Sequence, residues 1–125
     1  MSNIKEIGTK LVALCREGKA VEAIESFYDA NVVSIESSQY SPDFPRQIES
    51  KKAVLEKSKY WEKNTQVHSR EINGPFPHGD DKFAVTFKID ATMDGMGRST
   101  LEEVAVYEVK NGKIVKEEFF YEMGK

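Results

Sequence analysis

The first thirty residues alternate between apolar and polar positions with the period of a helix. Apolar side chains recur at spacings of three and four, first at Ile4, Ile7, Leu11 and Leu14 and then at Val21, Ile24 and Phe27. This spacing places each set on one helix face. Asn3 is a suitable N-cap for the first helix, and Gly18 is a suitable stop. The pattern therefore predicts two short antiparallel helices joined by a glycine-containing turn.

The periodicity changes after residue 30. Residues 31–37 are rich in β-branched side chains and predict a strand, whereas residues 38–48, with Ser41, Pro42, Asp43 and Pro45, predict a loop. A third helix is expected at 50–63, where Val54, Ser58 and Trp61 lie in line. Four further strands are expected at 65–73, 82–92, 98–110 and 113–122. Asn111-Gly112 between the last two is a strong signal for a two-residue hairpin turn.

Helices followed by a run of strands predict an α+β fold in the order helix, helix, strand, helix and four strands. The last two strands carry apolar side chains on both faces, because Val104 and Val106 alternate with Ala105 and Tyr107. A sheet that is apolar on both faces needs a cover on each side. Helices can cover one face, and we expect a second copy of the chain, in a homodimer, to cover the other.

Composition narrows the class of protein. The 125 residues suit a single domain spanning 1–125, and a net charge of −3 argues against nucleic-acid binding. No apolar run approaches the ~20 residues of a membrane span, and the first ten residues lack the apolar region of a secretion signal. The single cysteine, Cys15, cannot form an internal disulfide and fits a reducing compartment. We therefore expect a cytoplasmic protein.

Metal-ligating residues are sparse. His68, His78 and Cys15 have none of the usual zinc-ligand spacings, so neither a metal site nor another cofactor is expected.

Three segments carry a resemblance to a known family, namely GKAVEAIESFY, ANVVSIES and VAVYEVKNGKIVKEEFFY. In their order and pattern the chain resembles the SnoaL-like branch of the nuclear-transport-factor-2-like superfamily over nearly its whole length. The resemblance implies a cone-shaped, curved antiparallel sheet wrapped around three N-terminal helices, a largely apolar pocket, and dimerisation through the outer sheet face. The family includes polyketide cyclases, ketosteroid isomerase, dehydratases and non-catalytic binding proteins.

Ketosteroid isomerase allows a residue-by-residue comparison. The resemblance carries its general-base aspartate to Glu36, one methylene longer. Its two oxyanion donors carry over to Leu11 or Val12 and to Ala105, which have no side-chain donor. This argues against steroid isomerisation in that form.

The resemblance also implies which side chains face the pocket. On the strands they are His68, Arg70 and Ile72, then Glu103 and Tyr107, and finally Glu117, Phe119 and Tyr121. Trp61 and Phe87 are expected in the pocket wall, where aromatic side chains are common.

The ionisable candidates each have two interpretations. Glu36 is either a general base facing an apolar pocket or a solvated strand end. Glu103 and Glu117 are either an acid–base pair or partners in salt bridges with Arg70 or a helix lysine. His68 either orients or protonates a substrate or is a structural strand histidine.

Two hypotheses follow. In the first, the chain binds a small apolar or aromatic molecule and is a cofactor-free isomerase, cyclase or hydratase, with Glu36 as base and His68 or Glu103 as the second group. In the second, it is a non-catalytic ligand-binding or dimeric assembly module whose carboxylates are paired with cations. The discriminating feature is whether Glu36 and Glu103 are unpaired inside a pocket.

Overall fold

Two helices open the chain in the computed structural model, which describes residues 3–39 and 42–122. They are α1 (Ile4–Arg16) and α2 (Ala20–Phe27). The Asn3 side chain accepts a hydrogen bond from the Glu6 backbone N–H at 3.0 Å, and Gly18 takes a positive φ of 74° in the connecting turn. Both predicted helices are therefore confirmed, with the predicted cap and stop.

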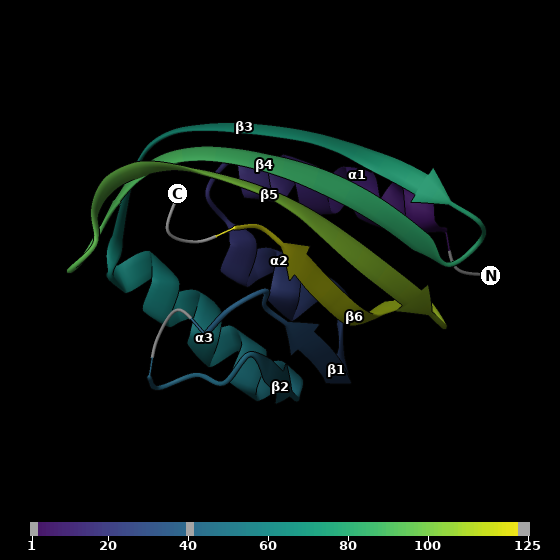
Figure 1. Ribbon diagram of the computed structural model, residues 1–125. Helices are drawn as coiled ribbons and strands as arrows, with labels where there is room; N and C mark the ends of the chain where they lie inside the picture. Colours follow the sequence, from purple (N-terminus) through teal and green to yellow (C-terminus); the bar gives the residue numbers. More distant parts are fainter. Residues whose placement is uncertain (1–2, 40–41, 123–125) are drawn as a thin grey trace.

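The rest of the chain forms one six-stranded sheet and a third helix. In chain order the elements are β1 (Tyr28–Ile35), β2 (Gln47–Glu49), α3 (Lys51–Lys63), β3 (Thr65–His78), β4 (Lys82–Met93), β5 (Gly97–Lys110) and β6 (Lys113–Phe120). The strands are arranged β2-β1-β6-β5-β4-β3. The β1–β6 pair is parallel, and the other pairs are antiparallel. Figure 1 shows the long strands β3, β4 and β5 extending across α1 and α2, with α3 beside β1 and β2. The α+β class is confirmed, whereas the cone shape stays a prediction.

The sheet differs from the sequence prediction in four places, the first being β1, which spans Tyr28–Ile35 rather than the predicted 31–37. The short strand β2 begins inside the predicted loop 38–48 and ends one residue beyond it. Its Ile48 is buried between exposed neighbours, and three residues are too few to show a period. (Ser41 of that loop is outside the described residues.) The predicted antiparallel sheet contains the parallel β1–β6 pair. Strand β3 continues through Pro75 and Pro77 to His78, which an edge strand tolerates because its outer groups have no strand partner.

The core lies between the helices and the inner face of the sheet. Leu11 and Val12 of α1 and Val54 of α3 are buried, and facing them are strand residues such as Val85, Ala105 and Ile114. The rings of Phe83 and Tyr107, which are opposite each other on β4 and β5, stack with centroids 5.0 Å apart. The inner sheet face is thus covered by helices, as the apolar pattern predicted.

The outer sheet face keeps some apolar surface. Val104 and Phe120 are opposite each other on β5 and β6 and are 40% and 48% exposed. No helix among the described residues is long and apolar enough to cross a membrane.

Gly8 marks a close approach of α1 to the sheet. A Cβ atom at this position would lie 2.6 Å from Pro75 Cβ and 3.2 Å from a ring carbon of Phe83. We expect Gly8→Ala to lower the free energy of unfolding by about 1–3 kcal/mol, because the clash outweighs the gain of about 1 kcal/mol in helix propensity. Urea denaturation measures the change. Thr9→Ala on the exposed side of α1 is the control and should leave stability unchanged or higher; a Gly8→Ala variant as stable as the parent would contradict this packing.

Candidate functional site

A cavity of about 240 Å³ lies between the helices and the inner face of the sheet. Its wall is mostly apolar, and all three helices contribute to it, together with β1, β4, β5, β6 and the residues that follow β1 and β6. Its apolar and aromatic lining includes Leu11, Ile24, Val54, Trp61, Phe87 and Phe119. A concave apolar wall with a few polar groups is the usual form of a small-molecule site.

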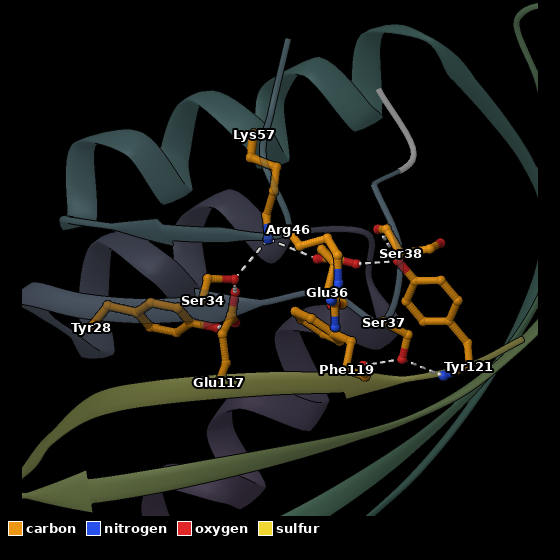
Figure 2. A network of polar contacts seen from close by, with 10 residues as sticks. All are labelled: Tyr28, Ser34, Glu36, Ser37, Ser38, Arg46, Lys57, Glu117, Phe119 and Tyr121. Carbon is orange, nitrogen blue, oxygen red and sulfur yellow. Dashed lines mark hydrogen bonds and ion pairs between the residues drawn. The ribbon is translucent and has the colours of Figure 1, made fainter. Parts of the chain in front are cut away.

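Lys57 of α3 brings a buried positive charge to this cavity. The side chain is only 7% exposed, and its Nζ lies 2.7 Å from Ser34 Oγ and 2.7 Å from Glu36 Oε2 (Figure 2). Nζ also lies 5.5 Å from the centroid of the Phe119 ring. A buried ammonium needs such partners, because its loss of hydration is otherwise uncompensated.

Glu36 is held on both of its oxygens. Lys57 pairs with one, and the Tyr121 hydroxyl donates to the other at 2.8 Å. The same hydroxyl lies 3.2 Å from the Ser38 carbonyl oxygen, and burial together with the Glu36 charge raises the pKa of Tyr121. Tyr121 therefore stays a neutral hydrogen-bond donor, and Glu36 is a paired carboxylate.

Glu117 lies deeper and is also satisfied. It is directly opposite Ser34 in the parallel β1–β6 pair and is 3% exposed. The Ser34 hydroxyl donates to its Oε2 at 2.6 Å and accepts from Lys57, while the Tyr28 hydroxyl donates to its Oε1. Burial raises the pKa of Glu117, and the Lys57 charge and the two hydroxyl donors oppose that rise. Ser34 thus connects Glu117 to the lysine.

Glu103 is different, because its carboxyl group has no hydrogen-bond or ion-pair partner among residues 3–39 and 42–122. It lies on β5 opposite Phe87 and lines the cavity, and among the described residues it makes no hydrogen bond or ion pair. Removal from bulk water raises its pKa to about 7; the charges of Glu36 and Glu117 add to the rise, and Lys57 opposes it. Part of the residue is still exposed, so Glu103 is half-buried overall.

The described part of the cavity wall therefore has more negative than positive groups. Lys57 is the only Lys or Arg among the described lining residues, and it faces Glu36, Glu103 and Glu117. Glu102 and Glu122 also line the cavity. No group of three or more His, Cys, Asp or Glu among residues 3–39 and 42–122 is arranged to hold a metal ion.

Most of the residues predicted to face the pocket meet there. Those that line the cavity are Glu36, Trp61, Phe87, Glu103, Tyr107, Glu117, Phe119 and Tyr121. Their functional roles stay predictions. The sequence left open whether these acids are unpaired or held in ion pairs. Glu36 has a lysine partner, whereas Glu103 has none among the described residues.

His68 and Arg70 do not line the cavity. His68 is exposed, with Nε2 2.8 Å from Thr92 Oγ1, because the β3–β4 register shifts between Val67 and Ser69 and interrupts the alternation. Arg70 is opposite Ile89, but it lies on the edge strand and is exposed there. Its guanidinium packs against Gly18, where an added Cβ would lie 3.1 Å from two of its nitrogens.

Sequence reasoning missed Lys57, Ser34 and Tyr28 as site residues. Lys57 is three residues after Val54 and four before Trp61, so the helical period already places it on the apolar face of α3. Ser34 lies between Val32 and Glu36 in the inward alternation of β1. A lysine at a core position of a helix was the signal that could have been used.

Glu36 and Glu103 give opposite expectations for the stability of their leucine variants. Glu36→Leu should lower the free energy of unfolding by about 3–5 kcal/mol, because Lys57 would be left buried without its carboxylate. Glu103→Leu should raise it by about 1–2 kcal/mol at pH 8, since a carboxylate without a partner among the described residues is replaced by an apolar side chain in an apolar wall.

The pH dependence of folding stability follows from the raised pKa of Glu103. In the unfolded chain this group has an ordinary pKa near 4.5, so the parent loses stability as the pH rises from there through about 7. The gain in free energy of unfolding from Glu103→Leu, relative to the parent, should therefore be larger at pH 8 than at pH 5. Urea denaturation at both pH values measures it; a Glu103→Leu variant that is less stable than the parent at pH 8 would show that the carboxylate has a structural partner.

Comparison with known protein families and solved structures agrees with the fold described above. The SnoaL-like domain family matches residues 1–121 of the chain. No curated protein sequence matches it. Among solved structures, a Mesorhizobium loti protein with the provisional name SnoaL-like polyketide cyclase is 35% identical, with a TM-score of 0.87 over 95% of this chain and 99% of that one.

Two more distant structures share the fold. A Bacillus subtilis protein with the provisional name isomerase is 22% identical, with a TM-score of 0.71 over 91% of this chain and 82% of that one. RV0760c from Mycobacterium tuberculosis, in complex with estradiol-17beta-hemisuccinate, is 18% identical, with a TM-score of 0.71 over 92% of this chain and 91% of that one. With a family match over nearly its whole length and this fold, the chain belongs to the SnoaL-like domain family.

Proposed function

We propose that this chain, as a single domain, binds a small, largely apolar molecule in the cavity and that Glu103 exchanges a proton with it. The observation that carries the proposal is the Glu103 carboxyl group, which faces an apolar cavity without a hydrogen bond or ion pair among the described residues. A carboxylic group of this kind, with a pKa of about 7, is present in both protonation states at neutral pH. General acid–base catalysis works best with such a group.

The other two acids are less suited to that role. Glu36 is paired with Lys57 and Tyr121, and Glu117 accepts hydrogen bonds from Ser34 and Tyr28. Removing a proton from a substrate would require either of them to give up these partners. In this proposal Glu36 therefore positions Lys57, and Glu103 takes the role of base that the resemblance gave to Glu36.

The chemistry proposed is cofactor-free proton transfer, as in isomerisation, cyclisation or hydration. In each of these reactions a group on the protein removes a proton from the substrate or returns one to it. The aromatic wall of Trp61, Phe87 and Phe119 would hold the apolar body of the molecule. Support comes also from RV0760c, a protein of the same fold that holds an estradiol derivative.

A non-catalytic binding module is the second candidate, and the Glu36–Lys57 pair favours it. A buried ion pair at 2.7 Å neutralises the carboxylate that the family resemblance marked as the base. In that case Glu103 would recognise a polar group on the ligand without moving a proton.

Deuterium exchange into a ketone separates these two candidates. 2-Tetralone has acidic protons beside its carbonyl and an aromatic ring that suits the cavity wall. In D₂O at pD near 8, the parent should accelerate exchange at these positions over buffer by about tenfold or more, because a positioned general base typically contributes at least that much. NMR or mass spectrometry follows the exchange.

Two variants complete this experiment. Glu103→Gln should reduce the exchange to the buffer rate, whereas Glu71→Gln, on the exposed part of β3, should leave it unchanged. If the ketone binds but the parent exchanges no faster than buffer, the catalytic proposal fails and the binding module stands.

We also propose that the protein forms a homodimer through the outer sheet face. The proposal rests on the adjacent, exposed Val104 and Phe120, which continue the two-faced apolar pattern of β5 and β6.

Solution mass measurement tests the dimer. The parent should have twice the chain mass of 14.2 kDa by light scattering, and Phe120→Lys should shift it toward the monomer, because a charge would replace an apolar contact. Met96→Lys, which replaces an exposed apolar side chain in the turn between β4 and β5, is the control and should stay dimeric. A monomeric parent would refute the dimer.

A further inference from the structure

The charge balance of the cavity points to the charge of its ligand. Lys57 is shared between Glu36, which it touches directly, and Glu117, which it reaches through Ser34. Among the described lining residues no other Lys or Arg is left for Glu103. An ionised Glu103 therefore lacks a counter-charge from this part of the chain, and ionising a carboxylate in an enclosed site is costly unless a positive group comes close.

The aromatic side chains of the cavity wall also favour a cationic ligand. Trp61, Phe87 and Phe119 line it, and aromatic ring faces attract cations. Phe119 already lies under the Lys57 ammonium, with 5.5 Å between Nζ and the ring centroid. An anionic ligand would meet Glu36, Glu103 and Glu117 with no unpaired cation among the described lining residues to receive it.

We propose that the ligand of this cavity carries a cationic nitrogen on an apolar or aromatic body, with Glu103 as its counter-ion. The inference rests on the proposed function only in that the cavity takes a small molecule. It also fits the proposed role of Glu103, because a nearby cation favours the ionised form of a carboxylate, which is the form that acts as a base.

Three probes of the same shape and different charge test the inference. Benzylamine is cationic at pH 8, benzyl alcohol is neutral, and benzoate is anionic. Their dissociation constants can be measured by NMR titration of the parent protein. We expect benzylamine to bind about tenfold or more tightly than benzyl alcohol, since a hydrogen-bonded charge pair contributes that much, and benzoate to bind more weakly than both.

The variant Glu103→Gln tests whether Glu103 causes the preference for benzylamine over benzyl alcohol. This variant keeps the shape of the side chain, so it should bind benzyl alcohol as the parent does. Its dissociation constants for benzylamine and benzyl alcohol should differ by no more than about twofold. Glu71→Gln should keep the full preference of the parent.

The outcomes separate this inference from the proposed function. If benzyl alcohol binds the parent as tightly as benzylamine, the cationic ligand is excluded while small-molecule binding stands. If Glu103→Gln keeps the amine preference, Glu103 is excluded as the counter-ion and the inference fails in that form. If none of the three probes binds, both the inference and the proposed binding function fail. Ketone exchange catalysed by Glu103 without any amine preference would leave only the proposed function.

Discussion

One buried ammonium group organises the polar interior of this protein. Lys57 is the only Lys or Arg among the described cavity-lining residues, and it contacts Ser34 and Glu36 at 2.7 Å. Through these contacts α3 is joined to β1, and the Ser34 hydroxyl in turn donates a hydrogen bond to Glu117 on β6 (Figure 2). Because a buried charge is costly without partners, the positions of these side chains depend on one another.

The same constraint divides the acids of the cavity into two kinds. Glu36 and Glu117 share the lysine and receive hydroxyl donors, so their place is explained by the network. Glu103 lies outside that network, and the described fold gives it an apolar neighbourhood without a partner. Stability alone would favour an apolar side chain at this position, and polar groups kept against stability are typical of functional sites. Glu103 is therefore the residue on which the proposed function depends.

The fold could be predicted where a period extends over several turns or strand residues. Helical spacing predicted α1 and α2, and the family resemblance placed Glu103, Glu117 and Tyr121 at the pocket, where all three line the cavity. The alternation failed at His68, because a register shift in β3 cannot be seen in the period. Lys57 was missed because a lysine in a charged helix is usually solvated, and only its place between Val54 and Trp61 distinguishes it. The pairing of each acid depends on contacts between distant segments, which no local pattern specifies.

The most direct test of the account is the titration of the Glu103 side chain itself. The carboxyl ¹³C chemical shift can be followed by NMR from pH 4 to pH 9, with the resonance assigned by its absence in Glu103→Gln. The account predicts a midpoint near 7, because the group is removed from water, lies near two other carboxylates and has no partner among the described residues. A midpoint near the ordinary value of 4.5 would contradict it and would show that Glu103 is solvated or paired.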